Sequence, residues 1–280
     1  MVKQQRVAGS VIAITGGGRG IGAAIAARAA AQGGVVALGD RDREAAVQTA
    51  AELGGRARGY SLDVTDEESF AAFLSAVETD LGPIDVLVNN AGVMWVGAFD
   101  AEPPSSSEAM VAVNLLGVIR GVRLAAPAMR RRGRGQIVTV ASAASKLAPP
   151  GEATYAATKH GVLGYLTAVR EELRGTGVTI SAILPGVVDT QLAAGTDTGA
   201  ASMLSPDEVA DAVVGVIGRP RFAVTVPGYI GPLVALTGLL PQRIRDAVLR
   251  RTVPDQVAAV KQSNARAGYE EQALRRDRDE

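Results

Sequence analysis

Short apolar runs alternate with longer segments of helical pattern along most of the chain. The first run, 11–14, is rich in β-branched residues, which favour strands, and it is short enough for a buried strand. Similar runs follow at 35–38, 58–62, 84–88, 136–140, 178–184 and 222–226. Strands that alternate with helices build parallel sheets covered on both faces. We therefore predict an α/β fold with one doubly wound parallel sheet of about seven strands.

The segments between these runs carry helix signals at their ends. Asp66 is placed to cap one helix, and Ser105 and Glu108 have the spacing of a capping box at the start of another. Pro127 lies inside this second, long helix, where we expect a bend. The predicted helices cover 23–31, 43–53, 66–79, 105–132, 154–174, 206–217 and 241–251.

No linker divides this pattern, so we predict a single domain over 1–260. The loop 191–204 is rich in Gly, Ala and Thr, and we expect it to be a mobile lid. The extension 227–251 is first apolar and then rich in arginine; packing over a cleft or at a subunit interface is favoured over peripheral membrane contact. The tail 261–280 is polar and charged, and we expect it to be a frayed helix or disordered.

Composition narrows the class of protein. Hydrophobic residues make up 47% of the chain and aromatic residues only 4%, which favours small side chains packed tightly around a sheet. The net charge of zero gives no case for nucleic acid or an anionic membrane as partner. The lack of cysteine excludes disulfides, thiolate catalysis and cysteine-ligated metal, and the one histidine, His160, argues against a histidine zinc site or a Ser-His-Asp triad. We expect neither a signal peptide nor a segment long and apolar enough to span a membrane, and hence a soluble, cytoplasmic protein.

A glycine cluster follows the first strand and opens an alanine-rich helical segment. Its sequence is Thr15-Gly16-Gly17-Gly18-Arg19-Gly20-Ile21-Gly22. Strand, glycine turn and helix in this order suit a dinucleotide, because glycines let the backbone approach a pyrophosphate whose charge rests on the helix start. Asp40 ends the second strand, where a carboxylate can bond both ribose hydroxyls of an adenosine and repels a 2′-phosphate. The alternative role of Asp40 is to cap the next helix.

Tyr155 and Lys159 form an i, i+4 pair in the predicted helix 154–174, so the phenol and the ammonium lie on one face. A free tyrosine has a pKa of about 10 and is a poor base. We expect the lysine cation to stabilise the phenolate and lower the pKa of Tyr155, which makes it a usable proton acceptor. His160 points about 100 degrees away from Lys159, and we expect a structural role for it.

Together these motifs resemble the short-chain dehydrogenase/reductase (SDR) family. The glycine turn has the spacing T-G-x-x-x-G-x-G, residues 89–92 read Asn-Asn-Ala-Gly, and residues 185–190 look like the family's P-G-x-x-x-T turn. Ser142 follows a strand and precedes Tyr155, and its spacing favours it over Ser145. The motifs occur in the family's order over 15–190, and the resemblance implies a Rossmann-type fold.

The resemblance also implies a set of site residues. The catalytic residues would be Asn114, Ser142, Tyr155 and Lys159. The cofactor-binding residues would be Gly16, Gly18, Arg19, Gly20, Ile21, Asp40, Arg41, Asp63, Val64, Asn90, Ala91, Gly92, Tyr155, Lys159, Pro185, Gly186, Val188 and Thr190. The substrate-binding residues would include Met94, Ala144, Leu147 and Val187.

By the same resemblance, the protein is an oxidoreductase that transfers a hydride between an alcohol carbon and a nicotinamide. Tyr155 would take the hydroxyl proton, Ser142 would hold the substrate oxygen, Lys159 would tune Tyr155 and bind the nicotinamide ribose, and Asn114 would position a relay water. The two hydroxyl donors would meet the developing oxyanion, so no metal is needed.

Other positions imply how the cofactor lies. In the family an acid at Asp63 contacts the adenine, and Thr190 bonds the nicotinamide carboxamide. Asp40 favours NAD, whereas Arg19 and Arg41 stand where basic residues often grip the 2′-phosphate of NADP in related enzymes. We predict NAD as the cofactor, with NADP as the alternative.

The residues expected around the pocket indicate only a class of substrate, and the resemblance indicates the oligomeric state. The expected pocket residues are mostly apolar, which suggests a hydrophobic secondary alcohol or ketone, such as a steroid, a terpenoid or a lipid-derived compound. The family implies a homodimer or homotetramer through the helices 105–132 and 154–174. A non-catalytic, nucleotide-sensing protein of the same fold is the alternative, but such a protein has no need for the complete Asn-Ser-Tyr-Lys set.

Overall fold

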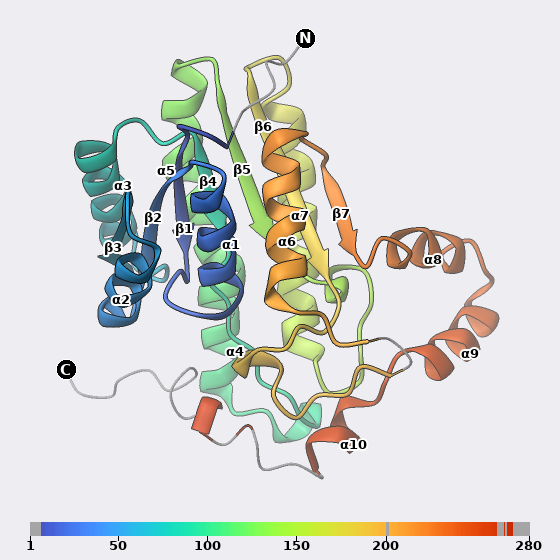
Figure 1. Cartoon of the computed structure of the whole chain (residues 1–280). Coiled ribbons are helices and arrows are strands. Elements are labelled where there is room, and N and C mark those ends of the chain that lie inside the picture. The colour runs from blue at the N-terminus through green and yellow to red at the C-terminus, as the bar shows by residue number, and fades with distance from the viewer. Residues whose placement is uncertain (1–6, 200–201, 262–265, 267, 271–280) are drawn as a thin grey trace.

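Seven parallel strands form one sheet in the order β3-β2-β1-β4-β5-β6-β7 (Figure 1). The computed structural model describes residues 7–199, 202–261, 266 and 268–270. The strands are β1 (Val11–Thr15), β2 (Val35–Asp40), β3 (Ala57–Ser61), β4 (Val86–Asn89), β5 (Gly135–Val140), β6 (Val178–Pro185) and β7 (Ala223–Val226). The predicted doubly wound α/β fold is confirmed.

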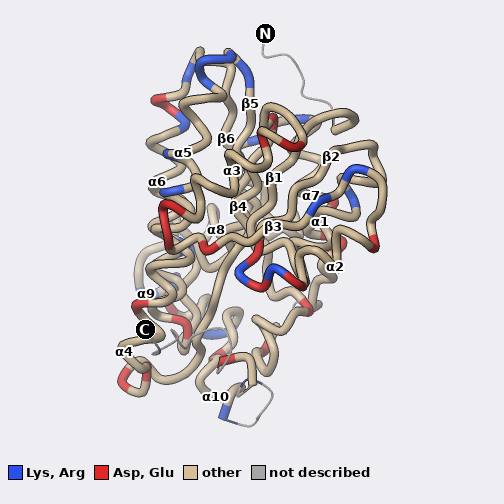
Figure 2. The backbone as a smooth tube through the Cα atoms, turned by 90° about the vertical axis from the view of Figure 1, so that its left-hand side faces the viewer, with Lys and Arg blue, Asp and Glu red and all other residues tan. Residues whose placement is uncertain are grey.

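Helices cover both faces of this sheet. One face carries α1 (Gly20–Ala31), α2 (Arg43–Leu53) and α7 (Pro206–Gly218). The other face carries α3 (Glu67–Leu81), α5 (Gly117–Arg131) and α6 (Ala153–Glu172). Figure 2 shows charged residues of both signs on the helices and turns around this sheet, whose central strands β1 and β4 carry none.

Side chains along a strand alternate between the two layers of the core. In β1, Val11 and Ala13 pack into the layer under α3, α5 and α6, and Ile12 and Ile14 pack into the layer under α1 and α7. Because both faces are covered, a strand is apolar at successive positions, and its sequence shows a continuous apolar run.

The chain order of the strands reverses at β1. Ile12 pairs with Val36 of β2 on one side and with Val86 of β4 on the other. The helices that follow β1 and β4 pack on opposite faces of the sheet, so a crevice opens between the carboxyl ends of these strands. Open α/β sheets bind ligands at such a reversal point.

The capping box predicted at Ser105 and Glu108 is wrong. The helix there, α4 (Pro104–Met110), begins earlier and has no side-chain cap. A proline in the first helical turn lacks the N–H group that a cap would satisfy. A capping box occurs instead at the start of α7, where the backbone N–H of Glu208 donates to Ser205 Oγ and the backbone N–H of Ser205 donates to the Glu208 carboxylate.

A π-helical segment, Val111–Leu116, joins α4 to α5, and α5 continues past Pro127. The combined helix Pro104–Arg131 is long and apolar enough to cross a membrane by length and composition, so the prediction that no segment meets this test is wrong. However, 44% of its apolar window is buried within the fold, and α5 packs on α3 and α6. Core helices of this kind pass the same test.

Beyond β7, the chain leaves the sheet and returns below the carboxyl ends of the strands (Figure 1). This part contains α8 (Ile230–Thr237), α9 (Gln242–Thr252) and α10 (Gln256–Lys261), of which only α9 has a predicted counterpart. Most of the predicted tail 261–280 lies outside the described residues. Within it, the Arg266 side chain is buried, with 4% of its surface exposed.

Candidate active site

A cavity of about 1200 Å³ opens at the carboxyl ends of the strands. Its wall is formed by the turns after β1 to β6, by α6, by α8 and by Tyr269 near the C-terminus. One end contains Asp40 and the glycine turn, and the other contains Tyr155. A single cavity therefore joins the predicted cofactor residues to the predicted catalytic residues.

The glycine turn lies against this cavity with little room for side chains. Gly16 and Gly20 have positive φ angles of 65° and 53°, which favour glycine. A Cβ atom added at Gly16 would lie 2.9 Å from the Cα of Ala91, and one added at Gly22 would lie 2.0 Å from the carbonyl oxygen of Gly16. The turn and the start of α1 thus form a cradle of backbone that fits the pyrophosphate of a dinucleotide.

Asn90 holds the glycine turn against the end of β4. Its side-chain amide donates to the carbonyl oxygens of Thr15 and Gly16, each at 3.0 Å. In return, Thr15 Oγ1 accepts from the backbone N–H groups of Asn90 and Ala91, each at 3.0 Å. These bonds fix the cradle at the point where the strand order reverses.

Asp40 faces the cavity at the end of β2 but does not cap α2. Its carboxylate accepts from the backbone N–H of Gly18 at 2.9 Å and from that of Asp42 at 3.0 Å. The helix cap is Asp42, which accepts from the backbone N–H of Ala45 at 3.1 Å. Asp42 also pairs with Arg19 at 2.8 Å, so one of the two predicted phosphate-binding arginines already has a carboxylate partner.

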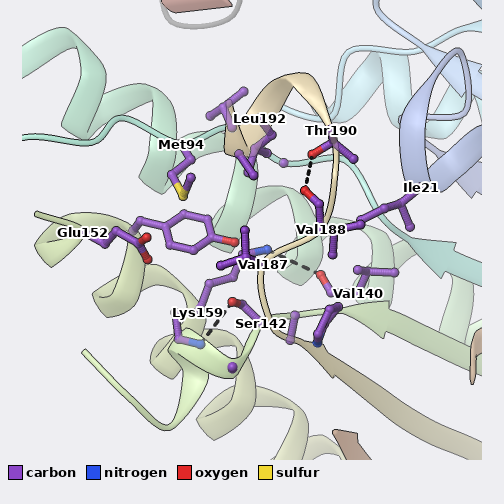
Figure 3. Close-up of a pocket in the computed structure, with 18 of the residues that line it drawn as sticks. Ile21, Met94, Val140, Ser142, Glu152, Lys159, Val187, Val188, Thr190 and Leu192 are labelled. Atoms are coloured by element: carbon purple, nitrogen blue, oxygen red, sulfur yellow. Dashed lines mark hydrogen bonds between the residues drawn. The ribbon is translucent and has the colours of Figure 1, made fainter. Parts of the chain in front are cut away.

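Asp63 and Thr190 line the cavity at two further strand ends. Asp63 Oδ1 accepts from the backbone N–H and the hydroxyl of Thr65, both at 2.7 Å, and the residue also faces the cavity; its contact with the adenine stays a prediction. Thr190 donates its hydroxyl to the carbonyl oxygen of Val188 at 3.3 Å, as Figure 3 shows.

Tyr155, Lys159 and Ser142 meet in the same part of the cavity (Figure 3). The Lys159 ammonium lies 5.5 Å from the centre of the Tyr155 ring and donates to the carbonyl oxygen of Val140 at 3.4 Å. Ser142 interacts with the Tyr155 hydroxyl by a side-chain hydrogen bond and accepts from the backbone N–H of Ala144 at 3.0 Å. The helix α6 and the turn after β5 thus supply a phenol, an ammonium and a hydroxyl to one point.

The predicted lowering of the pKa of Tyr155 is wrong for this structure. Burial raises that pKa above its ordinary value, and the negative charge of Glu152 raises it further; the hydrogen bond with Ser142 acts in the opposite direction. Burial also lowers the pKa of Lys159 to about 8. The Lys159 ammonium lies beside the Tyr155 ring and donates to Val140 rather than to the phenol oxygen. Its charge therefore lowers the pKa of Tyr155 less than burial raises it.

Asn114 lies behind the wall of the cavity, in the π-helical segment. Its Oδ1 accepts from the backbone N–H of Val93 at 2.8 Å, and its Nδ2 donates to the carbonyl oxygen of Val93 at 2.8 Å and to Thr158 at 3.4 Å. The side chain is fully buried, and π-helical segments occur often at functional sites. Its proposed part in a water relay stays a prediction.

The structure brings most of the predicted site residues together. Asn114 and Gly18 do not line the cavity, whereas all the other predicted catalytic, cofactor-binding and substrate-binding residues do. His160 is exposed and bonds to the carbonyl oxygen of Ala156 in its own helix, in keeping with the structural role expected for it. Ser145 is buried and does not line the cavity, whereas Ser142 does.

Several cavity residues were missed by the sequence analysis. They include Glu152, Tyr269 and residues of α8 such as Ile230 and Leu233. Arg266, just beyond the wall, donates to the carbonyl oxygens of Met94, Leu192 and Ala194. The position of Glu152 one helical turn before Tyr155 was a usable signal, but the C-terminal residues carry no local pattern that predicts their position.

Known proteins resemble this chain in sequence. A family model described as short chain dehydrogenase matches residues 10–200. A protein of Mycobacterium tuberculosis named probable oxidoreductase EphD is 32% identical over 268 residues, which cover 87% of this chain and 45% of that protein. The chain thus spans less than half the length of that relative. Estradiol 17-beta-dehydrogenase 11 of Rattus norvegicus is 30% identical over 255 residues, covering 89% of this chain and 86% of that protein.

Solved structures agree with this match. A short chain dehydrogenase/reductase from Burkholderia phymatum in complex with NAD has a TM-score of 0.78 and 28% identity, and the match covers 89% of this chain and 98% of that chain. A metagenomic short-chain oxidoreductase in complex with NADP has a TM-score of 0.68 and 34% identity, over 78% of this chain and 96% of that chain. The solved structures similar to this chain thus include one in complex with NAD and one in complex with NADP.

Proposed function

This chain belongs to the short chain dehydrogenase family, and on that premise we propose that it is an NAD-dependent oxidoreductase that interconverts a hydrophobic secondary alcohol and its ketone. The observation that carries the proposal is the meeting of Tyr155, Lys159 and Ser142 at one end of the cavity that also contains the glycine cradle. A protein that only senses a nucleotide needs the cradle but not these three side chains.

The mechanism follows from the positions of these groups. Bound NAD supplies the acceptor for the hydride that leaves the alcohol carbon. Ser142 donates a hydrogen bond to the substrate oxygen, and Tyr155 takes the hydroxyl proton as the carbonyl forms. Lys159 keeps a positive charge beside the phenol ring, which opposes the rise of the phenol's pKa on burial. In the reverse direction Tyr155 returns its proton to the carbonyl oxygen.

The preference for NAD rests on charge at the adenosine end of the cavity. Asp40 presents a carboxylate there, and Asp42 adds a second one that pairs with Arg19. A 2′-phosphate would meet both negative charges, whereas the free ribose hydroxyls of NAD would meet hydrogen-bond acceptors. Arg41 also lines this end, and its charge is the main argument for NADP as the alternative.

The preference for an apolar substrate rests on the wall beyond Tyr155. Met94, Ala144, Leu147 and Val187 line it, and α8 adds further apolar side chains, including Ile230 and Leu233. Apolar walls with a few polar groups are typical of sites for hydrophobic small molecules. The packing of α8 over this cleft also supports the role favoured for the extension 227–251.

We also propose a cytoplasmic homodimer or homotetramer. Val111 and Leu116, the first and last residues of the π-helical segment, are large hydrophobic residues with exposed side chains. They lie in the helical region through which subunits would associate. Leu236 and Leu239, at and just after α8, are more exposed still, and contact of this region with a membrane surface is the less favoured alternative. Sedimentation of the purified protein with and without lipid vesicles distinguishes the two.

The reaction class is tested by following cofactor reduction with a panel of hydrophobic secondary alcohols, with NAD and with NADP. We expect turnover with NAD that falls at least about 1000-fold in Tyr155→Phe, while NAD binding is unchanged. Turnover with NADP alone would show that Arg41 outweighs Asp40. Tight NAD binding without turnover of any alcohol or ketone would favour the nucleotide-sensing alternative, and full activity of Tyr155→Phe would overturn the mechanism.

A further inference from the structure

Glu152 stands at the N-cap of α6, one helical turn before Tyr155, but it does not cap the helix. A short polar side chain at this position, such as that of serine or aspartate, ordinarily accepts from the free N–H groups of the first turn. Here no such bond forms, and the residue lines the cavity instead. In Figure 3 its carboxylate points toward the centre of the cavity, on the same side as Met94.

This carboxylate is buried without a direct partner among the described residues. Glu152 is only 7% exposed, and no hydrogen bond or ion pair joins its side chain to the part of the chain that the structure describes. Burial raises its pKa to about 7, against an opposing effect of the Arg266 charge. Glu152 thus presents to the cavity an acceptor that no donor of the described residues occupies, and such an acceptor suits a hydrogen-bond donor on a ligand.

Arg266 does not fill the place of that ligand. Its guanidinium donates to the carbonyl oxygens of Met94, Leu192 and Ala194 at 2.7–3.0 Å, and it pairs with Glu270 at 3.0 Å. These contacts hold it against the backbone beyond the wall, so it affects Glu152 only through its charge.

We propose that Glu152 binds a second hydroxyl group of the substrate, so that the enzyme acts on alcohols and ketones with a further hydroxyl near the reacting carbon. This inference rests on the proposed dehydrogenase function and identifies the polar contact in its substrate site. A hydroxyl donates to the carboxylate without bringing a charge. A substrate carboxylate is repelled by Glu152, and an ammonium group is disfavoured by the nearby positive charge of Arg266.

Binding can be measured without turnover in the Tyr155→Phe variant loaded with NADH. The probes are cyclohexanone, the 2-, 3- and 4-hydroxycyclohexanones, and the cyclohexanone that carries a carboxylate in place of the hydroxyl. By calorimetry, at least one hydroxycyclohexanone should bind about tenfold more tightly than cyclohexanone, because a hydrogen bond to a charged group is among the stronger ones. The carboxylate probe should bind most weakly.

Adding Glu152→Gln should change the two polar probes in opposite directions. The advantage of the hydroxyl should fall severalfold, because an amide oxygen is a weaker acceptor than a carboxylate, and binding of the carboxylate probe should improve severalfold. A merely structural role of Glu152 would weaken all probes together. Glu108→Gln, at an exposed position outside the cavity, is the matched control and should change neither.

The outcomes separate this inference from the proposed function. Selective binding of the hydroxyl probe that depends on Glu152, with no turnover in the chain that has Tyr155, would support the polar contact and overturn the dehydrogenase function. If simple alcohols are turned over but cyclohexanone and all three hydroxycyclohexanones bind equally well, the function is supported and the inference is overturned. A carboxylate probe that binds best would also overturn it.

Discussion

The two ends of the cavity are held in different ways. At the cofactor end, turns that directly follow strands bond to one another, as Asn90 does with Thr15 and Gly16. At the substrate end, the wall is secured by residues far along the chain. Gln256 exchanges two 2.8 Å hydrogen bonds with the backbone of Asp197 in the loop 191–204, and Arg266 bonds to the same loop.

This difference separates what the fold requires from what a particular substrate requires. The turns at the cofactor end lie at the ends of buried strands, so they are fixed once the sheet forms. The substrate end also depends on α8, α10 and Arg266, which follow the last strand in the chain and contact loops of the wall. We therefore expect substitutions at the two ends to have separable effects.

The largest effect should come from Gly22→Ala at the cofactor end. The added methyl group would lie 2.0 Å from the carbonyl oxygen of Gly16, so the cradle has to shift. We expect NAD affinity to fall at least about 100-fold and the free energy of unfolding to fall by about 1–3 kcal/mol. Calorimetric titration with NAD and denaturant unfolding measure the two quantities.

Gly164→Ala is the matched control for Gly22→Ala. Gly164 is exposed in α6, and an added methyl group there would meet nothing within 4 Å. The substitution should raise the free energy of unfolding by about 0.5–1 kcal/mol, because alanine favours the helix, and it should leave NAD affinity unchanged. Equal losses of NAD affinity in both variants would contradict the assignment of the cradle.

A smaller and more selective effect is expected from Arg266→Met at the substrate end. The substitution leaves the carbonyl oxygens of Met94, Leu192 and Ala194 without their donor, so the wall loosens. The KM for the alcohol should rise about tenfold, while the dissociation constant of NAD stays within about twofold. Arg243→Met, at an exposed position of α9, is the control. A loss of NAD affinity equal to the loss for the alcohol would show that the two ends are not separable.

The limits of prediction from sequence follow the same division. The strands, the glycine turn, and the Tyr155 and Lys159 pair were predictable because apolar periodicity and i, i+4 spacing are local properties. The cap of α2 is also encoded locally, but by Asp42, whereas Asp40 was the residue considered for this role. Arg266 was not predictable, because its burial depends on carbonyl oxygens more than 70 residues away.

The pKa of Tyr155 shows a second limit. Helical spacing correctly placed Lys159 beside it, but spacing carries no information on burial, and burial dominates the shift. The same is true of Glu152, whose raised pKa follows from the depth of the wall rather than from its neighbours in the sequence. The direction of a pKa shift therefore cannot be inferred from the spacing of charged residues alone, because it also depends on the solvent exposure of each group.

The pH dependence should differ between the two directions of the reaction. In oxidation Tyr155 has to accept a proton, and its pKa is raised, so kcat/KM for the alcohol should increase from about pH 6 until Lys159 loses its proton near pH 8. In reduction Tyr155 is already protonated, so the rate should stay level and fall only as Lys159 loses its proton near pH 8. Initial rates in both directions across this range test the assignment. An oxidation rate that falls as pH rises would contradict it.

The smallest expected effect concerns the choice of cofactor. Asp42→Asn should keep the cap of α2, because asparagine caps helices as well as aspartate does, but it removes the ion pair with Arg19. Both side chains are about half exposed, so the pair is weak, and its loss should raise affinity for NADP relative to NAD by no more than about fivefold. Glu44→Gln, at an exposed position in the first turn of α2, is the control. If the ratio of the two affinities is unchanged, Arg19 does not face the 2′ position, and Asp40 alone accounts for the preference at the cofactor end.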